Sequence, residues 1–330
     1  MTPREAAIEG FLRGGAWKGT RRLPFAHDAS FRRYFRLDGG PRPALLMDAP
    51  PPQEDVRPWC RIARHLDRLG LSAPAIYEAD EAQGLLVIED FGDETFPRAL
   101  ERGDAGALYA AAVDTLVALH RAPSALAVDV PDYDERTLIE KAALLLDWFV
   151  PAIGGAVPDG ARAEYEAAWR AILPLRTGVP VSLALRDYFP ENIMWLPARG
   201  GVRRCGLLDF QDASRAPAVY DLVSLLEDAR RDVAEPLRQA MTERYLAAFP
   251  GQARADFLAA AAAMAAQRHA RVIGVFARLW RRDGKPRYLA HIPRVWRLLE
   301  RALRHPALAP LRRWFDAHVP AAQRRAPEAA

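Results

Sequence analysis

Hydrophobic positions in the first ninety residues switch between strand-like and helical spacing. Residues 31–37 interleave aromatic residues with arginines, and an Asp-Gly-Gly-Pro turn separates them from the apolar run 44–47. This pattern predicts a β-hairpin. Apolar residues within 56–70 recur at helical spacing and end at a glycine, which predicts a helix. Residues 75–77 and the fully apolar run 85–88 predict two further strands.

Helical spacing predominates in the rest of the chain. Two long periodic segments, about 253–281 and 292–303, predict helices. Between the helical segments, 192–196 and 206–210 are short strand candidates on either side of a glycine-containing turn. The sequence therefore predicts an α+β fold with a small antiparallel-sheet N-terminal lobe and a larger, mostly helical C-terminal lobe.

The expected lobe boundary follows the Glu-Asp-Phe-Gly segment that closes the apolar run 85–88. Residues 1–92 would form the N-terminal lobe, and residues 93–330 the C-terminal lobe. The tail after about residue 318 is rich in Ala, Arg and Pro and is expected to fray.

Composition narrows the class of protein. Half of the 330 residues are hydrophobic, 27% are charged and the net charge is +4, which is typical of a globular protein. The basic residues are mostly scattered arginines, so the sequence does not indicate a nucleic-acid binder. It shows no signal peptide and no apolar run of the ~18 residues that a membrane helix needs. We expect a cytoplasmic protein with no membrane contact and no obligate protein partner, with Cys60 and Cys205 as buried thiols.

The candidate chemistry lies in the segment RDYFPEN, residues 186–192, and in the segment LLDF that ends an apolar strand at residue 210. Asp187 could accept a proton from a substrate hydroxyl. Asn192, five positions later, and Asp209 offer the hard oxygen ligands that Mg²⁺ prefers. The alternative is that all three are turn or strand-capping residues. The apolar strand ending in Glu-Asp about a hundred residues upstream favours phosphoryl transfer from ATP, because a kinase hinge belongs there.

These segments resemble the aminoglycoside phosphotransferase and choline kinase superfamily, over roughly residues 20–305. The superfamily loop usually reads H-x-D-x-x-x-x-N, and this chain keeps the Asp but has Leu185 in place of His. The resemblance implies a protein-kinase-like two-lobed fold, with ATP and Mg²⁺ as cofactors. Residues 1–92 would then be the nucleotide-binding lobe, and residues 93–330 the catalytic and substrate-binding lobe. It also implies adenine contacts from the backbone near Glu89 and Asp90, and a supporting role for Asp221 beneath the catalytic loop.

Longer strings resemble one branch of the superfamily, the N-acetylmuramate/N-acetylglucosamine anomeric kinases of cell-wall recycling. They are ASFRRYFR and LMDAPP in the first half of the chain, and LDFQDA, QRH and FARL in the second half. This resemblance implies ATP-dependent phosphorylation of the C1 hydroxyl of an amino sugar in peptidoglycan recycling. Two alternatives stay open: a kinase for an aminoglycoside, a choline-like alcohol or another hydroxyl metabolite, and a nucleotide-binding pseudokinase.

The chain departs from the kinase pattern in its lysines. It has only three, and none falls near Met47, where kinases keep the lysine that binds the α- and β-phosphates. Arg32 and Arg33, beside the small residue Ser30, are the candidates to replace it, because a guanidinium can bind phosphate oxygens bidentately. The alternative is that Arg33 and Arg36 decorate the solvent face of a strand.

Three further residues have two open interpretations each. Arg186 could neutralise the transferred phosphoryl group or pair with a structural acid. Asp212 could contact sugar hydroxyls or cap the next segment. His269 could contact the sugar or be satisfied on a helix face, which its helical spacing favours. Trp280 and Trp296 have helical spacing and are expected in the core.

Overall fold

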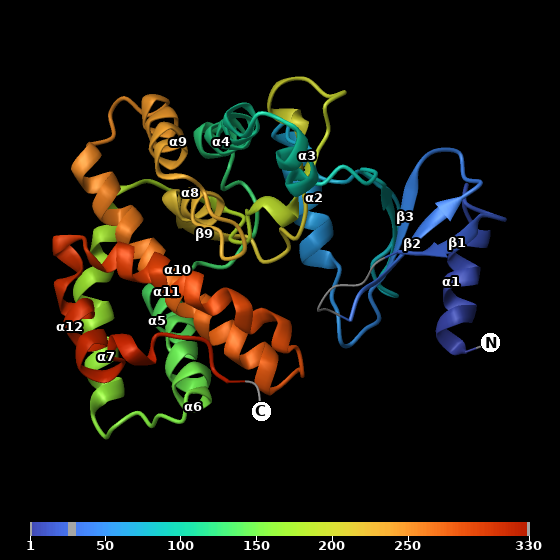
Figure 1. Ribbon diagram of the computed structural model, residues 1–330. Coiled ribbons are helices and arrows are strands. Elements are labelled where there is room, and N and C mark those ends of the chain that lie inside the picture. Colours follow the sequence, from blue (N-terminus) through green and yellow to red (C-terminus); the bar gives the residue numbers. More distant parts are fainter. Residues whose placement is uncertain (1, 26–30, 329–330) are drawn as a thin grey trace. The chain divides into compact units, whose positions relative to one another are not determined.

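The chain forms two compact units, and the computed structural model describes residues 2–25 and 31–328 (Figure 1). Unit 1 comprises Met1–Asp129 and Pro190–Ala213, and unit 2 comprises Val130–Phe189 and Ser214–Ala330. Each unit is thus built from two separate stretches of sequence. The lobe boundary after residue 92 stays a prediction.

Unit 1 is a mixed unit with an antiparallel five-stranded sheet in the order β1-β2-β3-β5-β4. Its elements are α1 (Pro3–Arg13), β1 (Arg21–Pro24), β2 (Arg33–Asp38), β3 (Ala44–Asp48), α2 (Arg57–Arg68), β4 (Ile76–Asp80), β5 (Leu85–Glu89), α3 (Phe96–Arg102), α4 (Ala105–Arg121), the 3₁₀ turns η3 (Pro190–Asn192) and η4 (Gly201–Arg204), β7 (Ile193–Trp195) and β8 (Cys205–Leu207). The apolar run 85–88 is an inner strand because both of its edges are paired, and its side chains are buried.

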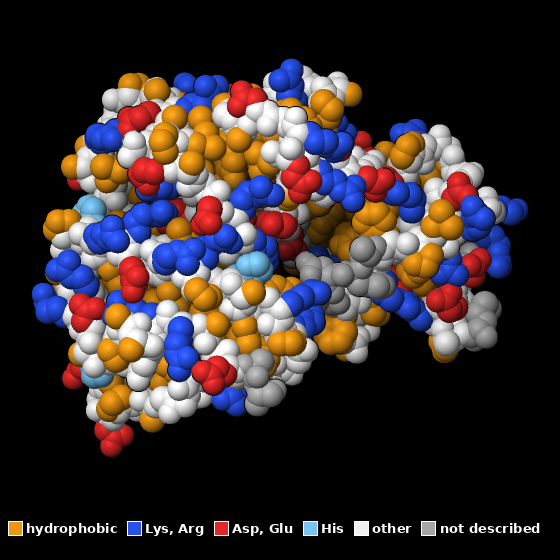
Figure 2. All heavy atoms as spheres, viewed as in Figure 1, with side chains coloured by type: hydrophobic (Ala, Val, Ile, Leu, Met, Phe, Trp, Pro, Cys, Tyr) orange, Lys and Arg blue, Asp and Glu red, His pale blue; other side chains and the backbone are white. Residues whose placement is uncertain are grey.

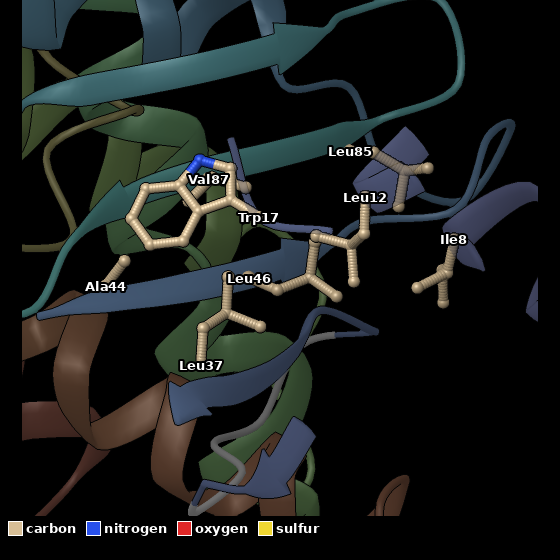
Figure 3. Close-up of a cluster of buried hydrophobic side chains, with 8 residues drawn as sticks. All are labelled: Ile8, Leu12, Trp17, Leu37, Ala44, Leu46, Leu85 and Val87. Carbon is tan, nitrogen blue, oxygen red and sulfur yellow. The ribbon is translucent and has the colours of Figure 1, made fainter. Parts of the chain in front are cut away.

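Helix α1 covers the sheet of unit 1, and the hydrophobic pattern did not predict it. Thr2 caps its N-terminus by accepting a hydrogen bond from the Glu5 N–H at 3.2 Å. Ile8 and Leu12 point from the helix into the cluster of buried side chains that Trp17 and the strands complete (Figure 3). Only two buried positions in eleven residues leave little periodic signal in the sequence.

Unit 2 is mostly helical and is organised around one long helix. Its elements are α5 (Glu135–Ala142), the π-turn η1 (Leu145–Phe149), α6 (Val150–Ala152), α7 (Ala161–Ile172), η2 (Leu173–Gly178), β6 (Val181–Ala184), β9 (Ser214–Pro217), α8 (Val219–Leu226), α9 (Glu235–Ala247), α10 (Arg254–Arg281), η5 (Pro286–His291), α11 (Ile292–Leu303), η6 (Pro306–Leu308), α12 (Ala309–His318) and η7 (Ala321–Gln323). Strands β6 and β9 pair antiparallel.

Helix α10 packs closely against its neighbours. A Cβ atom added at Gly274 would lie 2.3 Å from the backbone of Leu144, so glycine permits this approach of α10 to the chain entering η1. The chain after α12 also contacts the helices. Arg324 is only 9% exposed and pairs with Glu300 and Asp316 at 3.1 and 2.7 Å, contacts that the expectation of a frayed tail did not anticipate.

Several expectations from composition can be compared with the structure. Cys60 and Cys205 are buried free thiols, as predicted, and burial raises the pKa of Cys60 to about 12 and the pKa of Cys205 to about 11.

Trp296 is buried, whereas Trp280 is partly exposed, so the prediction that Trp280 lies in the core is wrong. In the viewed face of Figure 2, Lys and Arg side chains are spread over many elements with acidic side chains between them. Within the described ranges, no helix has the length and apolar character needed to cross a membrane.

Candidate active site

The predicted metal ligands lie together in unit 1. Asn192 ends the turn η3, and Asp209 follows β8, the strand that pairs with β7. The Leu208 N–H donates to the Asn192 carbonyl at 3.0 Å, so the hairpin brings the two segments together. The Asn192 amide nitrogen lies 3.4 Å from the Asp209 carboxylate, which also accepts from Gln211 at 2.8 Å.

This pair fits a Mg²⁺ ion by the chemistry of its donors. One carboxylate and one amide oxygen are hard ligands, and Mg²⁺ usually keeps several waters or phosphate oxygens besides one or two protein ligands. Among the described residues, no group of three or more His, Cys, Asp or Glu side chains could form a fuller protein cage. One carboxylate and one amide oxygen leave coordination positions that phosphate oxygens or waters can fill.

Two residues of the candidate site have an unusual backbone. Among the described residues, the non-glycine residues with positive φ are Arg186 at 68° and Asp209 at 56°. Such conformations cost free energy, and they persist where the surroundings hold them. Both positions come from the segments that the sequence singled out for chemistry, which supports a functional role for these segments.

The first part of the predicted catalytic loop, residues 186–189, lies in unit 2, and Asp221 supports its backbone. The N–H groups of Leu185 and Arg186 donate to the two carboxylate oxygens of Asp221 at 2.6 and 2.8 Å. Ser224, also on α8, donates to the Arg186 carbonyl at 3.1 Å. Asp221 is fully buried, and this burial raises its pKa to about 7 although the two backbone hydrogen bonds act in the opposite direction.

The predicted base has an ionic partner that the sequence did not reveal. The guanidinium of Arg271 on α10 lies 3.6 Å from the Asp187 carboxylate, and the two side chains are 16% and 22% exposed. The guanidinium of Arg186 contacts an aromatic ring: it lies over Tyr133, 4.6 Å from the ring centroid. Its side chain stacks on an aromatic residue of unit 2, and both interpretations of its role remain predictions.

The candidate phosphate-binding arginines differ in their surroundings. Arg32 donates to Glu54 at 2.9 Å, and the two side chains are 13% and 12% exposed. Glu54 also accepts from the Phe31 N–H at 3.1 Å, so one carboxylate fixes both the backbone and the guanidinium. The pKa of Arg32 is raised: burial lowers it, but Tyr34, Glu54 and Asp209 together outweigh burial. Arg32 is therefore held within electrostatic range of the candidate metal ligand Asp209.

The neighbouring arginines are engaged elsewhere. Arg33 donates to Asp48, a fully buried carboxylate that also accepts from Arg4 at 2.7 Å. Arg36 pairs with Asp90 at 2.5 Å and with Asp93 at 3.0 Å. These ion pairs favour a structural role for Arg36, whereas a phosphate contact from Arg33 stays a prediction. Ser30 lies outside the described residues.

The predicted adenine-binding segment is tied to the β7–β8 connection. The side chain of Glu89 pairs with Arg199 at 2.5 Å, and Arg199 also donates to Ser72 at 2.7 Å. The Glu89 N–H donates to the Ala75 carbonyl at 2.8 Å, and the Asp90 N–H to the Pro43 carbonyl at 3.5 Å. An adenine contact through these N–H groups would compete with existing bonds, so the assignment stays a prediction.

The two candidate sugar contacts, Asp212 and His269, lie in different environments. Asp212 is exposed, close after Asp209, and remains a candidate. His269 is completely buried on α10, and its Nε2 lies 2.7 Å from the Glu227 carboxylate. Burial lowers the pKa of His269, while Glu227 acts to raise it. This geometry favours the interpretation of a histidine satisfied inside the protein, and weighs against a sugar contact.

Glu54, Arg199 and Arg271 are the site residues that sequence reasoning missed. Glu54 and Arg199 lie in loops without a periodic pattern. Arg271 follows the QRH string by two residues, so that string was the signal that could have led to it. Each forms its ion pair with a residue 22 or more positions away, beyond the reach of local spacing.

Comparison with known proteins identifies the class. The model of a phosphotransferase enzyme family matches residues 22–258, and the chain belongs to this family. It has a kinase-like α+β fold: a choline kinase from Streptococcus pneumoniae superposes with a TM-score of 0.62 at 14% identity, over 93% of this chain and 99% of that one.

Two relatives are similar along nearly the whole chain. An N-acetylmuramate/N-acetylglucosamine kinase from Caulobacter vibrioides is 39% identical over 98% of both chains. A protein of the same name from Pseudomonas aeruginosa is 40% identical over 88% of this chain and 86% of its own. The chain is thus a phosphotransferase of the kinase type, similar to amino-sugar kinases.

Proposed function

We propose that this protein is an ATP-dependent kinase that phosphorylates the anomeric hydroxyl of N-acetylmuramate, N-acetylglucosamine or both. The observation that carries the proposal is the similarity of about two-fifths identity, over nearly the full length, to relatives named for these two sugars. The side chains of Asp187, Asn192 and Asp209 support it, because phosphoryl transfer to a hydroxyl needs an acceptor for the proton and oxygen ligands for a metal.

In the proposed reaction, the C1 oxygen of the sugar forms a bond to the γ-phosphorus of ATP. The bond from that phosphorus to the β,γ-bridging oxygen breaks, and ADP leaves with the electron pair. Asp187 orients the C1 hydroxyl and accepts its proton. Arg271 fixes the Asp187 carboxylate, and Asp221 holds the backbone of the loop from which Asp187 projects.

The nucleotide requires cations. Asn192 and Asp209 would hold Mg²⁺, which neutralises charge on the phosphates when bound. Arg32, fixed by Glu54, would supply the positive charge that kinases take from a lysine. A guanidinium makes planar, bidentate contacts, so its grip on the phosphates differs from that of a point charge. Because the reaction consumes ATP, we further propose that the protein acts in the cytoplasm, in the recycling of cell-wall sugars.

The test is product formation by the purified protein with ATP, Mg²⁺ and each sugar, followed by ³¹P NMR. We expect a glycosyl phosphate whose signal disappears after mild acid treatment, because an anomeric phosphate is acid-labile. Asp187→Asn should remove turnover while ATP binding is retained. The absence of any sugar phosphate from either substrate would refute the proposal. A panel with choline and aminoglycosides would then test the alternative substrates.

A further inference from the structure

Helix α10 presents a narrow open face within an otherwise buried stretch. From Ala263 to Ala277 the residues are buried except Arg271 and Val275, and the partly exposed Arg278 follows. These three positions are spaced i, i+4 and i+7, so they lie on one side of the helix. The long central helix of unit 2 is therefore partly exposed along a line that carries two arginines.

The first arginine ties this open face to the predicted base. The Arg271 guanidinium lies 3.6 Å from the Asp187 carboxylate, and this ion pair balances the charge of Arg271. Arg278 lies seven residues further on, about 10 Å along the helix axis at the usual rise per residue. A molecule that presents a hydroxyl to Asp187 would therefore extend along a surface that leads toward Arg278.

Within the described part of the chain, no carboxylate forms a direct ion pair with the Arg278 guanidinium. Its buried Nε atom has no hydrogen-bond partner within the described part of the chain. Burial lowers the pKa of Arg278, and the neighbouring cations Arg282 and Arg271 lower it further, whereas Asp283 acts in the opposite direction. Asp283 is itself paired with Arg282 at 2.7 Å. A partly buried guanidinium without a direct ion pair costs free energy, and an anionic ligand would offset this cost.

The two proposed substrates differ in one anionic group. N-acetylmuramate carries a lactyl ether on C3, two ring positions from the reacting C1, and this ether ends in a carboxylate. N-acetylglucosamine has a plain hydroxyl there. We infer that Arg278 binds the lactyl carboxylate of N-acetylmuramate, and thereby sets the preference of the enzyme between the two sugars. This inference rests on the proposed function.

The experiment compares kcat/KM for both sugars in the wild type and in Arg278→Met. A charged hydrogen bond is lost only with N-acetylmuramate, so we expect kcat/KM for that sugar to fall on the order of 10- to 100-fold. For N-acetylglucosamine, we expect a change of less than about 3-fold, the size of an ordinary surface substitution. Arg254→Met is a matched control, because Arg254 lies at the start of the same helix and pairs with Glu243.

The methyl ester of N-acetylmuramate completes the comparison. It keeps the shape of the lactyl group but lacks the charge, so the wild type should handle the ester as poorly as Arg278→Met handles the acid. The variant should not distinguish acid from ester. The inference would be overturned if Arg278→Met lowered kcat/KM equally for both sugars. It would also be overturned if the drop in kcat/KM from the acid to the ester were as large in the variant as in the wild type.

The two proposals fail in different ways. If the wild type forms no glycosyl phosphate from either sugar, the proposed function is wrong. If it phosphorylates both sugars and Arg278→Met leaves their ratio unchanged, only the role of Arg278 is wrong. If Arg278→Met does not fold, Arg278→Lys can replace it, because it keeps the charge. The ratio of kcat/KM for the acid to that for the ester in the wild type then gives the contribution of the carboxylate on its own.

Discussion

Asp221 offers a test that joins the stability of the protein to its catalytic loop. Asp221→Asn keeps the size of the side chain but leaves one acceptor oxygen for the two N–H groups of Leu185 and Arg186. An N–H group left without a partner in this buried place costs about 1–3 kcal/mol of the free energy of unfolding. The loosened loop would also displace Asp187, and we expect kcat to fall on the order of 10- to 100-fold.

The pH dependence gives this prediction a definite sign. The pKa of Asp221 in the folded protein is raised to about 7 from an ordinary value of 3.8, chiefly by burial. The stabilisation from protonation is therefore present at low pH and is lost as the pH rises toward 7. Between pH 5 and pH 7 this loss amounts to about 2–3 kcal/mol in the wild type. Asp221→Asn has no titrating group at this position, so its stability should not show this loss between pH 5 and pH 7.

The assay is urea unfolding followed by tryptophan fluorescence at pH 5, 6, 7 and 8. Other titrating groups affect both proteins alike, so the difference between wild type and variant isolates Asp221. We expect the variant to be less stable at pH 5 and to draw level with the wild type near pH 7–8. Asp232→Asn, at an exposed pair with Arg294, is the control and should change little. A difference that stays constant with pH, or an unchanged kcat, would refute the reasoning.

Three further predictions concern unit 1. Glu54→Gln should release Arg32 from its ion pair and raise the KM for ATP by about 10-fold, with a smaller effect on the KM for the sugar. An unchanged KM for ATP would show that the Arg32–Glu54 pair does not take part in nucleotide binding. Asp209→Asn should lower turnover on the order of 10²- to 10³-fold and shift the Mg²⁺ titration to higher concentration, whereas an unshifted titration would exclude it as a metal ligand. Arg199→Met should remove the partner of Glu89 and cost about 1–3 kcal/mol, measured by thermal unfolding; no loss would show that the pair is dispensable.

Local patterns in the sequence were enough to predict much of the fold. The apolar run 85–88 became an inner strand, and the periodic segment 253–281 became α10, with its boundaries within a residue. Both signals are strong because many buried positions repeat at one spacing. Helix α1 gave a weak signal, since its burial rests on Ile8 and Leu12 and its surface is polar.

The candidate site was predictable where its residues are close in sequence. Asp187 and Asn192 lie within one short segment, and the apolar strand before Asp209 marks the end of a hairpin. The partners of these residues were not predictable, because Arg271 meets Asp187 through the packing of α10, 84 positions further along the chain. The same limit applies to Arg36, whose ion pairs with Asp90 and Asp93 depend on how the strands associate.

The division of the chain into interleaved stretches limits how the protein can be dissected genetically. A fragment that ends near residue 92 would contain the five-stranded sheet but lack 190–213, and with it the segment that carries Asn192 and Asp209. In the folded chain that segment returns to the first stretch, where the Leu207 N–H donates to the Ser72 carbonyl at 2.7 Å. A shortened protein intended to bind nucleotide and metal alone would therefore have to join residue 129 to residue 190 with a designed linker. Expression of the first stretch alone would leave the Ser72 carbonyl without its hydrogen bond from Leu207.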